Sequence, residues 1–124
     1  MAHRILVVDD LRDAAETLSA LIVELGHEAT CVTDPREAVQ AARIFRPAMV
    51  FLDIGMPFIN GYELCPMLRT ALERSCVIVA VTAYGSALDR EHSRAAGFDA
   101  HLVKPVTGAL IRATIKELLE TPRT

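Results

Sequence analysis

Residues 48–57 read Ala-Met-Val-Phe-Leu-Asp-Ile-Gly-Met-Pro, and this stretch decides the fold. Ala48–Leu52 is apolar without interruption, which is typical of a short strand in a sheet that helices cover on both faces. A carboxylate directly behind such a strand needs a cation or hydrogen-bond donors nearby. The stretch therefore predicts a rigid central strand that ends at a functional acid, Asp53.

Four more short strands and five helices are predicted around this one. The other strands are Ile5–Val8, Glu28–Val32, Cys76–Val81 and Ala100–Val103. Apolar residues or capping signals mark helices over residues 14–25, 34–46, 61–72, 86–97 and 107–119. Strand and helix alternate five times, which predicts the α/β class with a parallel sheet.

Local signals mark three of these helices. Asp34 is placed as an N-cap, with Pro35 at the first helical position. Pro66 is expected to kink the third helix or to lie in its opening turn. Ser86, with Asp89 three residues later, predicts a capping box at the start of the fourth helix.

The fourth predicted helix has little apolar surface. Its apolar residues are Ala87, Leu88, Ala95 and Ala96. One interpretation is a well-solvated helix without further meaning. The other is a helix that opens at low cost, because few apolar contacts hold it.

Composition excludes several classes of protein. The chain has 124 residues, 52% of them hydrophobic, and a formal net charge of −3, which predicts one folded domain over residues 1–124 and no direct nucleic-acid binding. No apolar run is long enough to span a membrane, and the first residues do not form a signal-peptide core. Three cysteines without a Cys-x-x-Cys pair argue against a disulfide or zinc framework. We therefore expect a reduced, cytoplasmic domain with no room for an output domain.

Polar side chains stand at the ends of the predicted strands. Asp9 and Asp10 follow the first strand, Asp53 the third, Thr82 the fourth and Lys104 the fifth. Because parallel strands joined by right-handed crossovers end at one edge of the sheet, these groups are expected to converge there. Each residue alone has an ordinary explanation, such as a helix cap or a solvated charge. These separate explanations do not account well for acids, a hydroxyl and an amine that follow successive strands in this order.

The expected chemistry of this edge is phosphoryl transfer with a divalent cation. Three neighbouring carboxylates repel one another, and Mg²⁺, which prefers oxygen ligands, relieves the repulsion. A lysine ammonium and a threonine hydroxyl suit the oxygens of a phosphoryl group. One carboxylate can then act as the nucleophile, and Asp53 is the best candidate because its strand is central.

The chain resembles the receiver domain of two-component response regulators. The resemblance rests on four motifs in order: Ile-Leu-Val-Val-Asp-Asp, Leu-Asp-Ile-Gly-Met-Pro followed by Asn-Gly, Val-Thr-Ala, and Val-Lys-Pro. It covers nearly the whole chain, and the ordered set is highly specific. It implies a flavodoxin-like, doubly wound sheet of five parallel strands in the order 2-1-3-4-5, with five helices.

The resemblance also implies a role for each site residue. Asp53 would accept a phosphoryl group from the phosphohistidine of a histidine kinase or a histidine phosphotransfer protein. Asp10 would bind Mg²⁺ directly and Asp9 through water, while Asp53 and the backbone carbonyl of Gly55 would complete the protein ligands.

The remaining implied roles concern the phosphate and the switch. Lys104, in a cis peptide bond with Pro105, would pair with the acyl phosphate, and the hydroxyl of Thr82 would turn toward a phosphate oxygen. A downstream protein partner would bind the face of the fourth helix, fifth strand and fifth helix. The chain departs from the family at His101, where receivers usually carry Tyr or Phe. Two roles of His101 stay open: it takes part in switching, or it only packs at the surface.

Three other functions fit the sequence less well. A degenerate receiver that only binds a partner usually lacks an acid or the lysine, and none is missing here. A Mg²⁺-dependent phosphatase that works through an aspartyl phosphate is expected to carry a second acid two residues after its nucleophile, where this chain has Gly55. A flavin- or dinucleotide-binding domain lacks its glycine-rich loop here. Whether the receiver is free-standing or part of a larger regulator stays open.

Overall fold

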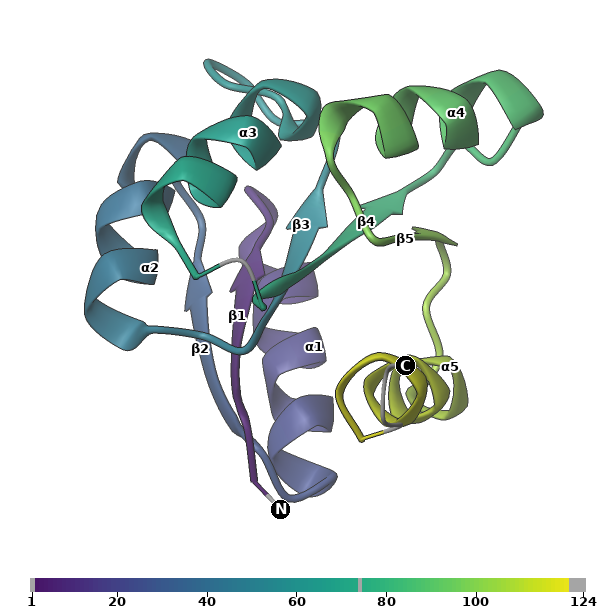
Figure 1. The fold of residues 1–124 in the computed structure, drawn as a ribbon. Coiled ribbons are helices and arrows are strands. Elements are labelled where there is room, and N and C mark those ends of the chain that lie inside the picture. The colour runs from purple at the N-terminus through teal and green to yellow at the C-terminus, as the bar shows by residue number, and fades with distance from the viewer. Residues whose placement is uncertain (1, 74, 121–124) are drawn as a thin grey trace.

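A parallel sheet forms the centre of the computed structural model, which describes residues 2–73 and 75–120 (Figure 1). In this part of the chain the strands are β1 (Arg4–Val8), β2 (Glu28–Val32), β3 (Met49–Asp53), β4 (Val77–Thr82) and β5 (Ala100–Val103). Their order in the sheet is β2-β1-β3-β4-β5, and every neighbouring pair is parallel. The predicted fold class and strand order are confirmed.

Helices cover both faces of this sheet (Figure 1). The α-helices are α1 (Arg12–Glu24), α2 (Ala38–Phe45), α3 (Gly61–Ala71), α4 (Ala87–Ala96) and α5 (Gly108–Ile115). Two short helical elements are also present: η1 (Pro35–Glu37), a 3-10 turn before α2, and η2 (Lys116–Glu120), a π-helical turn after α5. None of the described helices has the length and apolar character needed to cross a bilayer.

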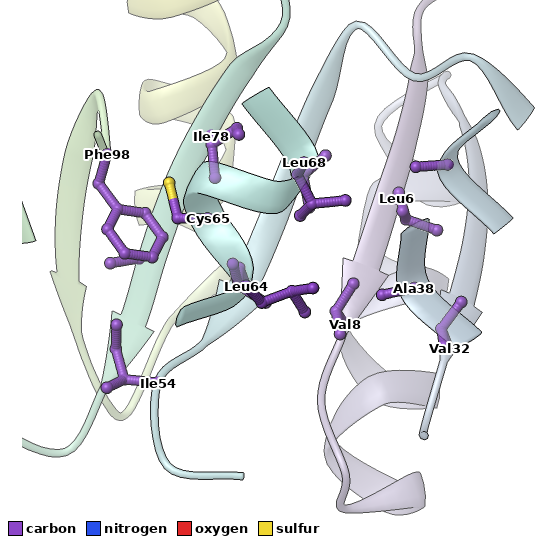
Figure 2. Close-up of a cluster of buried hydrophobic side chains, with 14 of the residues drawn as sticks. Leu6, Val8, Val32, Ala38, Ile54, Leu64, Cys65, Leu68, Ile78 and Phe98 are labelled. Carbon is purple, nitrogen blue, oxygen red and sulfur yellow. The ribbon is translucent and has the colours of Figure 1, made fainter. Parts of the chain in front are cut away.

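The two faces of the sheet bury separate hydrophobic clusters. Alternate residues of β1 point to opposite sides, so that Leu6 and Val8 pack with α2 and α3, while Ile5 and Val7 pack with α1 and α5. Figure 2 shows the first cluster, in which Leu64 and Leu68 of α3 lie over the strands. Burial on both faces explains why the central strands lack polar alternation.

The structure corrects the predicted start of the second helix and one of the two alternatives for Pro66. Asp34 does accept a hydrogen bond from the backbone N–H of Arg36, but the turn that it caps is the separate 3-10 turn η1, and α2 begins only at Ala38. Pro66 lies in the interior of α3 and not in its opening turn, and the helix continues to Ala71. Tertiary packing of the α3 face outweighs the hydrogen bond that proline cannot donate.

Two strands end one residue later than the sequence suggested. Asp53 and Thr82 are therefore the last residues of β3 and β4, and not the first residues after them. The backbone at both positions belongs to the sheet, which fixes where the two side chains begin. The capping box of Ser86 and Asp89 is present as predicted.

Candidate functional site

Three carboxylates meet at the carboxyl edge of the sheet. Asp9 and Asp10 follow β1, Asp53 ends β3, and one oxygen from each lies within 4.8 Å of the others. Asp9 and Asp53 are only 7% and 6% exposed, and Asp10 is half-buried. The three acids therefore converge as the strand ends predicted.

Backbone contacts hold Asp53 in place. The N–H of Ile54 donates to the carbonyl of Val81 at 3.2 Å, and the N–H of Gly61 donates to the carbonyl of Ile54 at 2.9 Å. A Cβ at Gly61 would lie 2.7 Å from the carbonyl oxygen of Asp53. Only glycine allows α3 to start so close to the strand end. The Asn-Gly pair in the sequence was the available signal for this residue.

Lys104 lies between two of the acids. Its Nζ is 3.5 Å from Oδ1 of Asp53 and 3.6 Å from Oδ2 of Asp9. The backbone N–H of Lys104 donates to the carbonyl of Thr82 at 2.8 Å, which fixes the start of the lysine side chain beside β4. The following peptide bond, to Pro105, is cis, as the resemblance implied.

Thr82 is buried at the same edge, with 4% of its surface exposed. Its Oγ1 accepts a hydrogen bond from the backbone N–H of Tyr84 at 3.2 Å. The threonine hydroxyl therefore contacts the loop that leads into α4. Gly55 is exposed at the same edge.

Burial raises the pKa of Asp53 above that of an ordinary aspartate. The neighbouring Asp9 carboxylate adds to the increase, while the Lys104 ammonium and the Gly55 N–H oppose it. The charged form of Asp53 is therefore disfavoured in the metal-free protein. A cation beside the three acids would stabilise the charged carboxylate of Asp53 and so oppose this increase in its pKa.

The donor set suits a hard divalent cation. The three acids offer only oxygen ligands, and two of them are too buried for water alone to compensate their charge. Mg²⁺ prefers a few carboxylates together with water, whereas zinc prefers nitrogen and sulfur. The residues fit a magnesium ion.

His101 contacts the same loop as Thr82. Its Nε2 is 2.8 Å from the carbonyl oxygen of Tyr84, and its Nδ1 is 2.7 Å from Oγ of Ser93 on α4. Sequence reasoning singled out His101 but missed Ser93 and the Tyr84 carbonyl. A serine eight positions earlier and a backbone carbonyl leave no pattern in a sequence.

Comparison with known families gives the class of protein. Residues 5–116 match the family model of the response regulator receiver domain. The chain belongs to this family.

Curated relatives agree with this assignment. The chain is 35% identical over 116 residues to the transcriptional regulatory protein PrrA of Mycobacterium bovis, a match that covers 94% of this chain and 49% of the relative. It is 34% identical over 116 residues to a probable transcriptional regulator, ycf27, of Cyanophora paradoxa, with 94% and 48% covered. The chain thus spans about half the length of these curated relatives.

Solved structures share the fold. The chemotaxis protein CheY4 of Vibrio cholerae superposes with a TM-score of 0.89 at 25% identity, covering 96% of this chain and all of that one (100%). The receiver domain of the sensor histidine kinase PA1611 of Pseudomonas aeruginosa gives a TM-score of 0.85 at 28% identity, with 98% and 100% covered. That structure has a magnesium ion coordinated in its active-site cleft.

Proposed function

We propose that this receiver accepts a phosphoryl group on Asp53 from the phosphohistidine of a histidine kinase or a histidine phosphotransfer protein. The observation that carries the proposal is the convergence of Asp9, Asp10 and Asp53 around a point that the Lys104 ammonium also approaches. Family membership supports phosphoryl acceptance as the general behaviour.

Four groups would hold the metal ion. We assign Asp10 as a direct ligand and Asp9 as a ligand through water, with Asp53 and the Gly55 carbonyl completing the protein donors. When bound, Mg²⁺ supplies positive charge that offsets the carboxylates and the phosphoryl oxygens. The raised pKa of Asp53 supports this role, because an ion at that point restores the charged, nucleophilic carboxylate.

The transfer exchanges one bond to phosphorus for another. A carboxylate oxygen of Asp53 forms the new P–O bond while the P–N bond of the donor phosphohistidine breaks, and the leaving imidazole nitrogen keeps the electron pair and takes up a proton. Lys104 pairs with a phosphoryl oxygen, and the hydroxyl of Thr82 donates a hydrogen bond to another. Hydrolysis later breaks the P–O bond, because water takes the phosphoryl group as inorganic phosphate and the Asp53 carboxylate is regenerated.

The proposed consequence of phosphorylation is a change in partner binding. We propose that phosphorylation alters the α4–β5–α5 face and with it the affinity for a downstream protein. The relatives PrrA and ycf27 are transcriptional regulators, so a regulatory partner or a regulatory part of a longer chain fits this proposal. We propose that this reaction takes place in the cytoplasm.

Incubation of the purified chain with acetyl phosphate and Mg²⁺, followed by intact-mass measurement, tests the proposal. We expect an adduct of one phosphoryl group on the wild type. The adduct should be absent from Asp53→Asn and from samples that contain a chelator. Glu16→Gln, which removes an exposed carboxylate on α1, serves as the matched control and should be modified like the wild type. An unmodified wild type would instead indicate a domain that only binds a partner.

A further inference from the structure

The loop between β3 and α3 contains a phenylalanine in an unusual backbone conformation. Phe58 has a φ of 68°, in the left-handed region that non-glycine residues rarely adopt, and it is 72% exposed. The N–H of Ile59 donates to the carbonyl of Pro57 at 2.8 Å, so Phe58 is the central residue of a three-residue turn. A turn of this kind with a positive φ at its centre is the rare and strained form of the γ-turn. Because Phe58 is exposed, burial of its ring does not offset this strain.

The guanidinium of Arg36 lies over the ring of Phe58. Its Cζ is 4.0 Å from the ring centroid, which is within the range of a cation–π contact. Arg36 belongs to η1, the turn after β2, whereas Phe58 follows β3. In the sheet β1 lies between β2 and β3, and Asp9 and Asp10 follow β1. The Arg36–Phe58 contact therefore joins two segments on either side of the strand end that carries two acids of the site.

The guanidinium of Arg36 is itself held by Asp34. Nε of Arg36 donates to Oδ1 of Asp34 at 3.0 Å, and Nη2 donates to Oδ2 at 2.9 Å. The backbone N–H of Arg36 also donates to Oδ1 of Asp34 at 2.9 Å, and Pro35 between the two residues is buried. Two bonds to one carboxylate fix the plane of the guanidinium. Arg36 therefore loses little side-chain freedom when it contacts the ring.

The loop that Arg36 contacts also carries Gly55, whose carbonyl is a proposed metal donor. Ile54 and Met56, on either side of Gly55, are 7% and 8% exposed, and the N–H of Met56 donates to the carbonyl of Ile54 at 3.0 Å. These contacts anchor the first half of the loop. The second half contains the strained turn at Phe58. Only two residues separate Phe58 from Gly55, so a change in the turn is transmitted over a short stretch of backbone.

We propose that Arg36 is a positioning residue for the metal site, because its contact with Phe58 holds the β3–α3 loop in the conformation that presents the Gly55 carbonyl. A strained backbone conformation persists only where its surroundings stabilise it, and the guanidinium supplies this stabilisation. Without it, the turn relaxes for part of the time, and fewer molecules offer the carbonyl to a cation. The contact is a property of the metal-free protein, whereas its effect on Mg²⁺ rests on the function proposed above.

Amide hydrogen exchange at Ile59 in the metal-free protein tests whether the contact holds the turn. Arg36→Met removes the guanidinium and keeps an unbranched side chain, and we expect the Ile59 amide to exchange about threefold faster, the effect of losing one exposed cation–π contact. Phe58→Leu, which removes the ring and keeps the strain, should give the same increase. Arg43→Met removes another exposed arginine, on α2, and should exchange at the wild-type rate. Unchanged exchange in both Arg36→Met and Phe58→Leu would overturn the proposal.

Magnesium affinity, measured by titration calorimetry without any phosphoryl donor, tests the positioning role. Arg36→Met should bind Mg²⁺ about threefold more weakly than the wild type, since the loop is then less often in the binding conformation. The sign is informative, because loss of a positive charge near an acidic site would by itself favour a cation. Arg43→Met should bind at least as tightly as the wild type. Equal or tighter binding by Arg36→Met would overturn the positioning role, as would equal weakening in the two variants.

The variant Phe58→Gly separates the contact from any other effect of Arg36. Glycine adopts the left-handed region without strain, so the turn no longer needs the guanidinium. Arg36→Met should therefore weaken Mg²⁺ binding about threefold in the wild-type background and leave it unchanged in the Phe58→Gly background, a double-mutant cycle that isolates the pair. The same weakening in both backgrounds would show that Arg36 acts independently of Phe58 and would overturn the proposal.

Acetyl phosphate and Mg²⁺ distinguish failure of this proposal from failure of the proposed function. A wild type that binds no Mg²⁺ and forms no adduct would contradict both. A wild type that binds Mg²⁺ and forms the adduct, beside an Arg36→Met variant of equal Mg²⁺ affinity, would overturn only the role of Arg36. We expect both proteins to form the adduct at saturating Mg²⁺, with the variant requiring about three times the Mg²⁺ concentration for half of the maximal rate.

Discussion

Helices α3 and α4 begin in the same way and are held to the protein in different ways. Each follows a strand of the site, β3 or β4, and each starts with a capping box, Asn60 with Glu63 and Ser86 with Asp89. The buried residues of α3 are Gly61, Leu64, Cys65 and Leu68, and the last three belong to the first hydrophobic cluster (Figure 2). Of the ten residues of α4, only Ser93 is buried.

The two ends of α4 differ as well. After its last turn the chain is anchored by Phe98, which is 6% exposed and lies near Cys65 of α3 (Figure 2). The Arg69 guanidinium of α3 also donates to the carbonyl of Gly97 at 2.8 Å. The first turn has no apolar anchor, since Leu88 is 80% exposed.

This contrast separates a helix held by apolar burial from one whose first turn is held mainly by hydrogen bonds. Displacement of α3 would expose buried apolar side chains, which costs several kcal/mol of free energy. The start of α4 is held by single hydrogen bonds, each of which contributes about 1 kcal/mol. Segments with few buried apolar contacts open at lower free energy. The interpretation of the fourth helix as one that opens easily therefore has structural support, and the stable helix lies directly beside it.

The largest effect is expected from removing an apolar anchor of α3. Leu68→Ala deletes a fully buried side chain and should lower the free energy of unfolding by about 3 kcal/mol. Leu88→Ala on α4 should change it by less than about 0.5 kcal/mol, because that leucine is already in water. Urea unfolding measures both. Similar losses in the two variants would remove the contrast between the helices.

Metal binding should stabilise the edge of the sheet where β1 and β3 end and α3 begins. At a Mg²⁺ concentration of about 100 times its dissociation constant, the free energy of unfolding should rise by about 2.7 kcal/mol. Asp10→Asn, which removes one proposed ligand, should lose most of this gain at the same concentration. The measurement is thermal unfolding with and without chelator. An equal Mg²⁺ gain in the variant would exclude Asp10 as a ligand.

The start of α3 should be sensitive to a single methyl group. Gly61→Ala places a Cβ 2.7 Å from the Asp53 carbonyl oxygen and should cost about 2 kcal/mol of unfolding free energy. Gly108→Ala, where the nearest contact would be an ordinary 3.7 Å, is the control and should be close to neutral. Chemical denaturation compares the pair. A neutral Gly61→Ala would mean that α3 can shift away from the strand end.

The smallest effect concerns the charge of Asp53. Because its pKa is raised in the folded state, ionisation destabilises the fold, and Asp53→Asn should raise the metal-free free energy of unfolding at neutral pH. The gain is present above the raised pKa and disappears as pH falls below the ordinary aspartate value, where both states are protonated. Unfolding curves across this pH range check the sign. A destabilised Asp53→Asn at neutral pH would contradict the raised pKa.

The site was largely predictable because its residues stand at strand ends. Continuous apolar strands indicate a parallel sheet, and a parallel sheet brings the ends of β1, β3 and β5 to one edge, so the meeting of Asp9, Asp53 and Lys104 followed from pattern alone. Predicting that these residues meet did not require knowledge of how their side chains are oriented. The family resemblance added the strand order, which the structure confirms.

The polar contacts of α4 could not be predicted in the same way. The bonds of His101 depend on the turn of α4 that faces β5 and on a backbone carbonyl in a loop, and neither has a residue pattern. The opening-turn alternative for Pro66 is wrong for a related reason, since the buried face of α3 keeps the helix intact through a residue that disfavours helix. Local signals were least informative where tertiary contacts decide.

The most direct test of the central claim identifies which carboxylate carries the phosphoryl group. After reaction with acetyl phosphate and Mg²⁺, borohydride reduces an aspartyl phosphate to homoserine and releases phosphate, and peptide mass spectrometry then locates the homoserine. The account predicts homoserine at position 53 and intact aspartates at 9 and 10. Homoserine at position 9 or 10, with Asp53 unmodified, would contradict it.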